Sequence, residues 1–263
     1  VQCLCQAKNH ALVMSDTPIE RTVAGVINSA FGCAGQRCMA LSCCVVEDAI
    51  ADRFVAELKK QASAIKVGPA YDKTSKLGPI TYEKHYKEVL ADIDKGVREG
   101  ATLVLDGRNC KVDGYENGYY VGPTVFDNVT EDMTIGRDEV FGPVLCIKRC
   151  KDFNEGLAKM NANPYANGSV IFTQSGYFAR EFVRHTDGGM VGAAVQQDQV
   201  RGGVKARIPV FEPGVPPGQD LVHRCVVVLS LKTLYLKFFI GALVRFAVFI
   251  NNHTCNIFRA CKV

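Results

Sequence analysis

The chain has 263 residues, enough for one large domain or two small ones with a sizeable hydrophobic core. Its net charge of +4 excludes a strongly basic nucleic-acid-binding body, because the positive excess comes from the part after Asp220, which contains no acidic residue. The 12 cysteines follow neither zinc-ligand spacing nor a regular disulfide framework, so we predict a reducing compartment and no metal site.

The first predicted helix begins near Thr17. Thr17 fits the N-cap, Pro18 the first helical position and Glu20 the third. From Val23 to Phe31 apolar residues recur at helical spacing, which predicts a helix with one buried face.

The segment from Phe31 to Cys38 reads F-G-C-A-G-Q-R-C and carries the most informative signal of the chain. Gly32 and Gly35 allow a sharp turn, so we expect Cys38 on a constrained turn directly after Arg37. A cysteine reacts as its thiolate, which a neighbouring cation favours, and Cys38 is therefore a candidate nucleophile. The alternative is that Cys38 is one of many buried structural cysteines.

After this turn, strand and helix patterns alternate. Short apolar runs bounded by turn residues predict strands, and apolar residues three or four positions apart predict helices. Asp48 is expected to cap the second helix, and Asp152 with Glu155 to cap a later one. Strands are predicted at 41–46, 103–105, after 114–125, at 144–148, 169–172 and 190–195, and helices at 50–65, 86–97, 152–160 and 176–185. This alternation predicts an α/β fold with a mainly parallel sheet flanked by helices.

Several polar residues give no catalytic signal in the sequence. Lys8 and the five histidines lie in no recognisable catalytic spacing. We interpret His10 and His85 as surface groups.

The composition changes near Ala193. Residues 193–220 are predicted to form a polar linker rich in glycine and proline, and residues 221–263 an apolar, basic tail. The run from Phe238 to Ile250 contains Arg245 and is too short for a membrane span, so membrane association is not expected. The abrupt change suggests a tail foreign to the preceding fold.

Several motifs in one order resemble the aldehyde dehydrogenase superfamily, and within it the CoA-acylating branch acting on malonate and methylmalonate semialdehyde. F-G-C-A-G-Q-R-C followed by M-A-L-S is similar to the cysteine signature of that branch. The other motifs are K-N-H, L-G-P-I, G-Y-E-N-G with V-G-P-T, E-V-F-G-P-V and N-P-Y-A-N-G. The resemblance covers about residues 7–192 and implies a catalytic domain at 1–192 that lacks the family's N-terminal NAD-binding half.

The resemblance implies a covalent reaction with NAD as cofactor and coenzyme A as co-substrate. Cys38 would attack the aldehyde, hydride would pass to NAD, and CoA would cleave the resulting thioester. A β-carboxylate would also be lost as carbon dioxide, giving propionyl-CoA or acetyl-CoA, in valine and thymine catabolism. The branch also implies the mitochondrial matrix and allows a homo-oligomer.

The resemblance assigns roles to four residues. Glu139 would bind the nicotinamide ribose, Phe141 would pack near the nicotinamide, and the Cys38 amide would donate to the oxyanion. Arg37 would hold the substrate carboxylate or CoA, because a guanidinium offers paired donors. From the residues alone, Glu139 is equally a solvated acid and Arg37 a surface ion-pair partner.

The sequence also departs from the family. The position of the hydrolytic glutamate falls on Leu4, which cannot activate water, so thiolysis is favoured over hydrolysis. No glycine-rich phosphate loop precedes Cys38. We therefore predict that the chain alone is nearly inactive, and the alternative function is a non-catalytic remnant that at most associates with full-length subunits.

Overall fold

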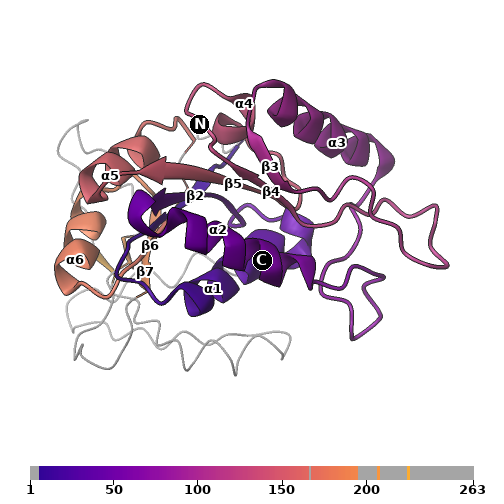
Figure 1. Cartoon of the computed structure of the whole chain (residues 1–263), viewed down its shortest axis with the longest axis horizontal. Helices are drawn as coiled ribbons and strands as arrows, with labels where there is room; N and C mark the ends of the chain where they lie inside the picture. Colours follow the sequence, from indigo (N-terminus) through magenta and orange to yellow (C-terminus); the bar gives the residue numbers. More distant parts are fainter. Residues whose placement is uncertain (1–5, 166, 195–205, 208–223, 226–263) are drawn as a thin grey trace, which may run out of the picture. The chain divides into compact units, whose positions relative to one another are not determined.

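A seven-stranded sheet forms the centre of the chain (Figure 1). The structure is a computed structural model that describes residues 6–165, 167–194, 206–207 and 224–225. The strands are β1 (Asn9–Val13), β2 (Leu41–Glu47), β3 (Thr102–Leu105), β4 (Thr124–Asp127), β5 (Val144–Cys150), β6 (Gly168–Phe172) and β7 (Met190–Ala194). Their order is β3-β4-β5-β2-β1-β6-β7, and only β3 runs antiparallel to its neighbour. The predicted α/β fold with a mainly parallel sheet is confirmed.

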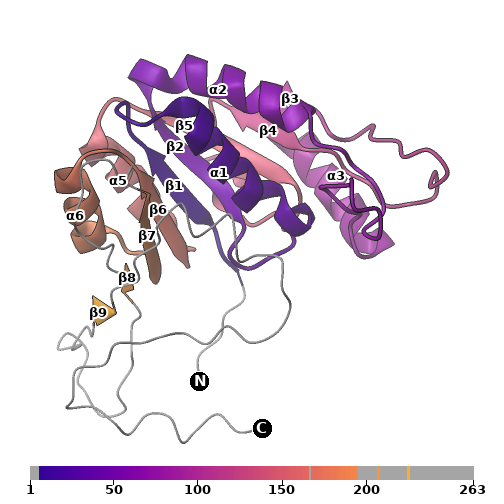
Figure 2. The same ribbon diagram turned by 90° about the horizontal axis from the view of Figure 1, so that it is seen from below.

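Helices cover both faces of this sheet. Figure 2 shows α1 and α2 side by side over one face, where they pack on the apolar side chains of β1 and β2. On the other face, α5 and α6 pack against a second cluster that includes Leu12, and α3 packs against α4. The helices are α1 (Ile19–Phe31), α2 (Asp48–Ser63), α3 (Glu83–Arg98), α4 (Thr134–Arg137), α5 (Phe153–Asn161) and α6 (Gly176–His185), with a short 3-10 turn at Gly32–Gly35.

Two predicted helix caps are wrong. Pro18, not Thr17, occupies the N-cap of α1, and the Thr17 hydroxyl instead shares a 2.7 Å hydrogen bond with the Thr22 hydroxyl. Asp48 is already the first residue of α2, so Glu47 stands at the cap and makes no side-chain cap bond. Helix α1 therefore begins two residues after the expected cap, and α2 begins at the expected cap itself.

The capping pair of α5 is confirmed. The Asp152 side chain accepts a hydrogen bond from the Glu155 amide at 2.9 Å. The Glu155 carboxylate in turn accepts from the Lys151 amide at 3.0 Å. This reciprocal arrangement satisfies amides at the helix start that have no partner within the helix.

Central strand β1 is buried along its whole length, including its polar residues. His10 was expected at the surface, and that expectation is wrong, since only 3% of the residue is exposed. Its Nδ1 lies 2.7 Å from the Lys8 carbonyl oxygen. Desolvation lowers the pKa of His10 to about 3, so the ring is neutral in the folded protein.

The sequence also led to predictions outside the described residues. Leu4 lies there, as do the linker at 193–220 and the tail at 221–263, apart from the end of β7 and the paired strands β8 (Ala206–Arg207) and β9 (Arg224–Cys225). Within the described part of the chain, no helix combines the length and the apolar character needed to cross a bilayer.

Candidate active site

The candidate residues gather where parallel strands begin. Cys38 lies on the turn that enters β2, Glu139 and Phe141 lie on the loop that enters β5, and Asn167 immediately precedes β6. Since neighbouring parallel strands start at the same edge of the sheet, these segments are brought together by topology. The candidate residues therefore lie at the edge opposite the carboxyl edge, where most open α/β sheets bind ligands.

The turn that carries Cys38 is conformationally constrained. Cys33, Ala34 and Gly35 have φ values of 54°, 53° and 70°, a left-handed region that side chains other than glycine rarely adopt. Cys38 follows in a turn and is an exposed residue. The prediction of a constrained turn is confirmed, and the alternative of a buried structural cysteine is contradicted by this exposure.

Two asparagine side chains hold the backbone of Cys38. The Nδ2 atoms of Asn9 and Asn167 donate to the Cys38 carbonyl oxygen at 2.9 and 2.8 Å. Asn9 also donates to the Ala40 carbonyl at 2.7 Å and accepts from the Gly168 amide at 2.7 Å. The starts of β1, β2 and β6 are thereby tied to the residue that bears the thiol.

The Cys38 turn also meets the Glu139 loop through direct backbone contact. A Cβ atom added to Gly35 would overlap the carbonyl group of Gly142. Only glycine allows this approach, and Gly35 also has the positive φ of the turn. The cysteine motif and the E-V-F-G-P-V motif are therefore packed against each other.

Glu139 is half-buried at the edge of a pocket. Its Oε2 accepts a 3.2 Å hydrogen bond from the Ala7 amide, and desolvation raises its pKa, against the opposing effects of that amide and of the Lys8 charge. The pocket has a volume of about 200 Å³ and is lined by Asp92, Lys95, Thr134, Ile135, Asp138, Glu139 and Val140. A carboxylate beside such a pocket can accept hydrogen bonds from hydroxyl groups of a ligand.

Phe141 is held in a left-handed conformation with a partly exposed ring. Its φ is 55° and 38% of the residue is exposed. His85 Nε2 lies 2.8 Å from the Phe141 carbonyl oxygen, and the two rings are 6.1 Å apart. The expectation that His85 is a surface group is wrong, because only 12% of its side chain is exposed and it contacts a candidate site residue.

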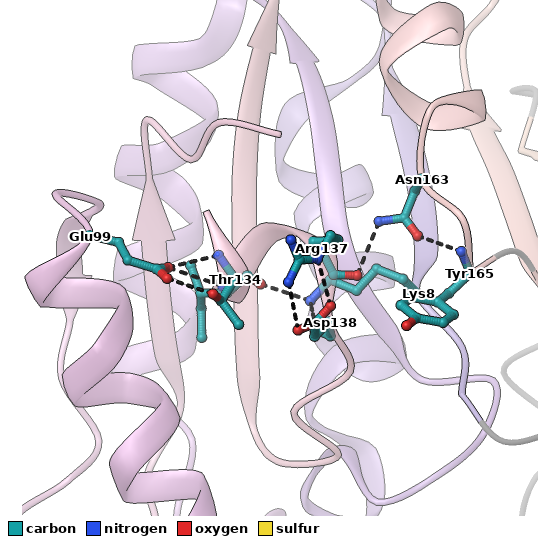
Figure 3. Close-up of polar contacts among 8 residues, drawn as sticks. Lys8, Glu99, Thr134, Arg137, Asp138, Asn163 and Tyr165 are labelled. Atoms are coloured by element: carbon teal, nitrogen blue, oxygen red, sulfur yellow. Dashed lines mark hydrogen bonds and ion pairs between the residues drawn. The ribbon is translucent and has the colours of Figure 1, made fainter. Parts of the chain in front are cut away.

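A network around α4 anchors the residues that lead into Glu139 (Figure 3). At the start of α4, the Glu99 carboxylate accepts from the Thr134 amide at 2.8 Å and from its hydroxyl at 2.6 Å. At the other end, Lys8 Nζ donates to the Asp138 carbonyl at 2.8 Å, and Asn163 Nδ2 donates to the Arg137 carbonyl at 3.1 Å. This loop is thus fixed at both ends by side chains distant in sequence.

The Arg37 side chain is bound to the end of α1. Its Nη2 donates to the carbonyls of Ser29 and Asn28, at 2.7 and 3.3 Å, in the last turn of α1. Its Nε is buried and has no partner among the described residues. The guanidinium therefore caps the carboxyl end of α1 in this structure, where a cation is favourable.

Sequence reasoning missed Lys8, Asn9, His85 and Asn167. Lys8 and Asn9 belong to the K-N-H motif that was noticed without a role, and their position just before a central strand is the signal that could have found them. Nothing in the local pattern around His85 pointed to Phe141, which is distant in sequence. Among the described residues, no group of three or more histidine, cysteine or acidic side chains is arranged to hold a metal ion.

Comparison with known proteins gives one consistent family. A sequence model of the aldehyde dehydrogenase family matches residues 1–206. The chain is 47% identical over 195 residues to malonate-semialdehyde dehydrogenase 1 of Oceanobacillus iheyensis, a match that covers 74% of this chain and 40% of that protein.

Solved structures agree with the sequence comparison. The methylmalonate-semialdehyde dehydrogenase of Oceanimonas doudoroffii has a TM-score of 0.71 at 40% identity, over 72% of this chain and 39% of that one. A 1-pyrroline-5-carboxylate dehydrogenase from Thermus with bound NAD has a TM-score of 0.68 at 28% identity, over 73% and 36%.

Two further points follow from these matches. The chain spans about 40% of the length of the curated relatives it matches. Those relatives come from Oceanobacillus and Bacillus, bacteria that have no mitochondria, so the expected location in a mitochondrial matrix is wrong.

Proposed function

This chain belongs to the aldehyde dehydrogenase family, and on that premise we propose that it carries the nucleophile of an NAD-dependent semialdehyde dehydrogenase. The proposed substrates are malonate and methylmalonate semialdehyde, with coenzyme A as acyl acceptor. The resemblance extends this to acetyl-CoA or propionyl-CoA as products and to valine and thymine catabolism. The observation that supports the proposal is the exposed residue Cys38 on a turn packed against the Glu139 loop.

In the proposed mechanism, Cys38 performs the covalent chemistry. The thiolate attacks the aldehyde carbon and forms a carbon–sulfur bond, while the carbonyl oxygen becomes an alkoxide. The Cys38 amide, which donates to no acceptor among the described residues, would stabilise that oxygen. The clamp from Asn9 and Asn167 fixes the peptide on the other side of Cys38 and so limits the motion of the sulfur.

NAD, when bound, accepts the hydride that leaves the alkoxide carbon and so converts the adduct to a thioester. The residues of this chain fit the nicotinamide-ribose end of that cofactor. Glu139 borders the pocket with one oxygen held by Ala7, and its other oxygen accepts no hydrogen bond within the described residues, so it is available to a ribose hydroxyl. The partly exposed Phe141 ring offers an apolar surface for a nicotinamide.

The thioester on Cys38 is then cleaved by the CoA thiolate, which takes the acyl group and returns the Cys38 thiolate. Before this transfer the substrate's β-carboxylate leaves as carbon dioxide. The electron pair of the broken carbon–carbon bond passes into the thioester enolate, whose α-carbon takes a proton from water, so the transferred group is acetyl or propionyl. Arg37 stays a predicted substrate-binding residue. Its guanidinium would have to leave the carbonyls of α1 to contact a carboxylate.

Acyl transfer in reverse tests this proposal without the need for NAD. Propionyl-CoA added to the chain should acylate the Cys38 sulfur and release CoA, detectable by peptide mass spectrometry. Cys38→Ser should abolish the adduct, while Cys33→Ser, which removes the other exposed thiol of the same turn, should leave it unchanged. Absence of acylation in the wild-type chain would instead support the non-catalytic remnant.

Turnover tests the complete reaction. With NAD, CoA and methylmalonate semialdehyde, we expect the chain alone to be slower than its relatives by at least about 10² to 10³. The resemblance implies a second oxyanion donor, an asparagine, in the family's first half, and loss of one such donor typically costs this much. NADH formation that requires CoA would support thiolysis over hydrolysis. Family-like turnover by the isolated chain would contradict the prediction that it is nearly inactive.

A further inference from the structure

Lys8 is a buried ammonium whose partners are backbone carbonyls. Only 2% of the residue is exposed, and Nζ lies 2.8 Å from the carbonyl oxygens of Ile135 and Asp138. It forms no ion pair with a carboxylate in the described part of the chain. A buried charge without a counter-charge is costly, and an uncharged chain of similar length would fill the same volume at lower cost. Packing alone therefore does not explain this lysine.

The two carbonyls that Lys8 holds lie directly before Glu139. Ile135 belongs to α4, and Asp138 is the residue that connects α4 to Glu139. The opposite end of α4 is held by Glu99 (Figure 3), so the loop has one anchor on each side. Of these two anchors, Lys8 is the one adjacent to the candidate cofactor-binding carboxylate.

The residues on either side of Lys8 contact the two motifs of the site. The Ala7 amide donates to Glu139 Oε2 at 3.2 Å, and Asn9 Nδ2 donates to the Cys38 carbonyl at 2.9 Å. Three consecutive residues at the start of β1 thus hold the nucleophile turn and the Glu139 loop together. The Lys8 side chain is the longest and most deeply buried part of this connection.

We propose that Lys8 is a positioning residue, whose ammonium holds the Glu139 loop on β1 at a fixed separation from Cys38. The inference rests on the proposed function, because it gives Glu139 a cofactor to bind. The Lys8 charge acts on Glu139 and Asp138 in the same direction, lowering the pKa of each, and so opposes the desolvation that raises the pKa of Glu139.

The test uses two substitutions of Lys8 and one matched control in the whole chain. Lys8→Met keeps the length of the side chain and removes the charge and donors, and Lys8→Arg restores the charge. Lys148→Met is the control, because Lys148 is equally buried at 2% exposure but its ammonium faces Glu131 at 3.8 Å. Amide hydrogen exchange at residues 138–141 reports loop anchoring, and a carboxyl-carbon NMR titration reports the pKa of Glu139.

In Lys8→Met we expect amide exchange at residues 138–141 to accelerate at least about tenfold and the pKa of Glu139 to rise. Lys8→Arg should restore the pKa of Glu139 toward the wild-type value, and Lys148→Met should change neither readout. If Lys8→Met does not fold, amide exchange at residues 138–141 is measured in Lys8→Arg instead. Exchange faster than in the wild type is expected there, because the guanidinium donors differ in geometry from the ammonium. Wild-type exchange and an unchanged Glu139 pKa in the folded Lys8 variants would overturn the inference.

Acylation of Cys38 by propionyl-CoA separates this inference from the proposed function. If the wild-type chain is not acylated while the Lys8 variants show the expected changes at Glu139, the proposed function fails and the anchoring role of Lys8 is retained. If acylation proceeds while the Glu139 readouts do not respond to Lys8, the inference fails and the nucleophile assignment is retained.

Discussion

Cys38 and Cys43 are the same residue type in contrasting environments. Cys38 lies on the exposed turn that enters β2, whereas Cys43 is fully buried inside β2. Desolvation raises the pKa of Cys43 to about 12, and it raises the pKa of the neighbouring Cys44 as well. A short stretch of chain thus separates an accessible thiol from thiols that the core keeps protonated.

The buried part of the sheet around Cys43 contains polar side chains that are held in their uncharged forms. His10, Cys43 and Cys146 face each other in register across β1, β2 and β5, on the side of the sheet that carries Lys8 and Lys148. Burial keeps the thiols protonated and the His10 ring neutral. The edge of this sheet thus allows thiol chemistry that burial prevents in its interior.

The largest expected difference between the two regions is in alkylation. At about pH 7, a thiol with a pKa of about 12 is ionised to roughly one part in 10⁵ and Cys43 is also shielded from reagent. Iodoacetamide should therefore modify Cys38 at least about 10³-fold faster than Cys43. Peptide mass spectrometry over time measures both rates in one sample.

Cys33 provides the internal comparison for that experiment, because it is exposed on the same turn. A nucleophile assignment requires Cys38 to react faster than Cys33 as well as faster than the buried thiols. Cys38→Ser should remove the fast phase alone. Equal labelling rates of Cys33 and Cys38 would mean that exposure alone explains the reactivity of Cys38, and would contradict its assignment as the nucleophile.

Acid should destabilise the buried region through His10. The pKa of His10 is lowered from 6.5 to about 3 in the folded state. Between these two pH values the unfolded chain binds a proton at His10 that the folded chain does not bind. Stability should therefore fall by about 1.4 kcal/mol per pH unit as pH drops from about 6 toward 3, up to about 4 kcal/mol in total.

Urea unfolding at several pH values measures that loss. His10→Gln should flatten the dependence in this window by one proton, while His185→Gln, at an exposed position, should not. The difference between the two variants removes the shared contribution of the carboxylates. An unchanged slope in His10→Gln would mean that the ring is not held neutral.

Most elements of this fold were predictable from local pattern, although strand β1 and helix α4 were not predicted, and only part of the site was predictable. Short apolar runs located β2 and β5, which are buried on both faces, and helical spacing located α5 and α6, each of which buries one face. The turn before Cys38 was also predictable, since Gly32 and Gly35 allow a sharp turn. The polar start of β1 was not, because Lys8, Asn9 and His10 are satisfied by partners far away in sequence, such as Ile135 and Gly168.

Close packing of the turn can be tested at glycine. Gly35→Ala combines a positive φ with overlap of the Gly142 carbonyl, and should cost about 3 kcal/mol of unfolding free energy. Gly100→Ala is the matched control, because Gly100 has a φ of 94° but open space around its Cα, and should cost about 1 kcal/mol. Denaturant unfolding gives both values, and equal costs would contradict the contact between the two motifs.

The asparagine clamp joins the exposed turn to the buried strand, and its two members should differ in strength. Asn9 is 5% exposed and makes three hydrogen bonds, so Asn9→Ala leaves the Ala40 carbonyl and the Gly168 amide without partners and should cost about 2 kcal/mol. The Asn167 side chain makes a single hydrogen bond of its own, to the Cys38 carbonyl, from a more exposed position, and the residue has a φ of 123°. Asn167→Gly, which relaxes that backbone, should cost about 1 kcal/mol or less. Urea unfolding measures both costs.

If the clamp positions the thiol, Asn9→Ala should also slow alkylation of Cys38 relative to Cys33, since a looser turn leaves exposure unchanged but loses the fixed geometry. A stability loss with an unaltered rate ratio would confine Asn9 to holding the strands together.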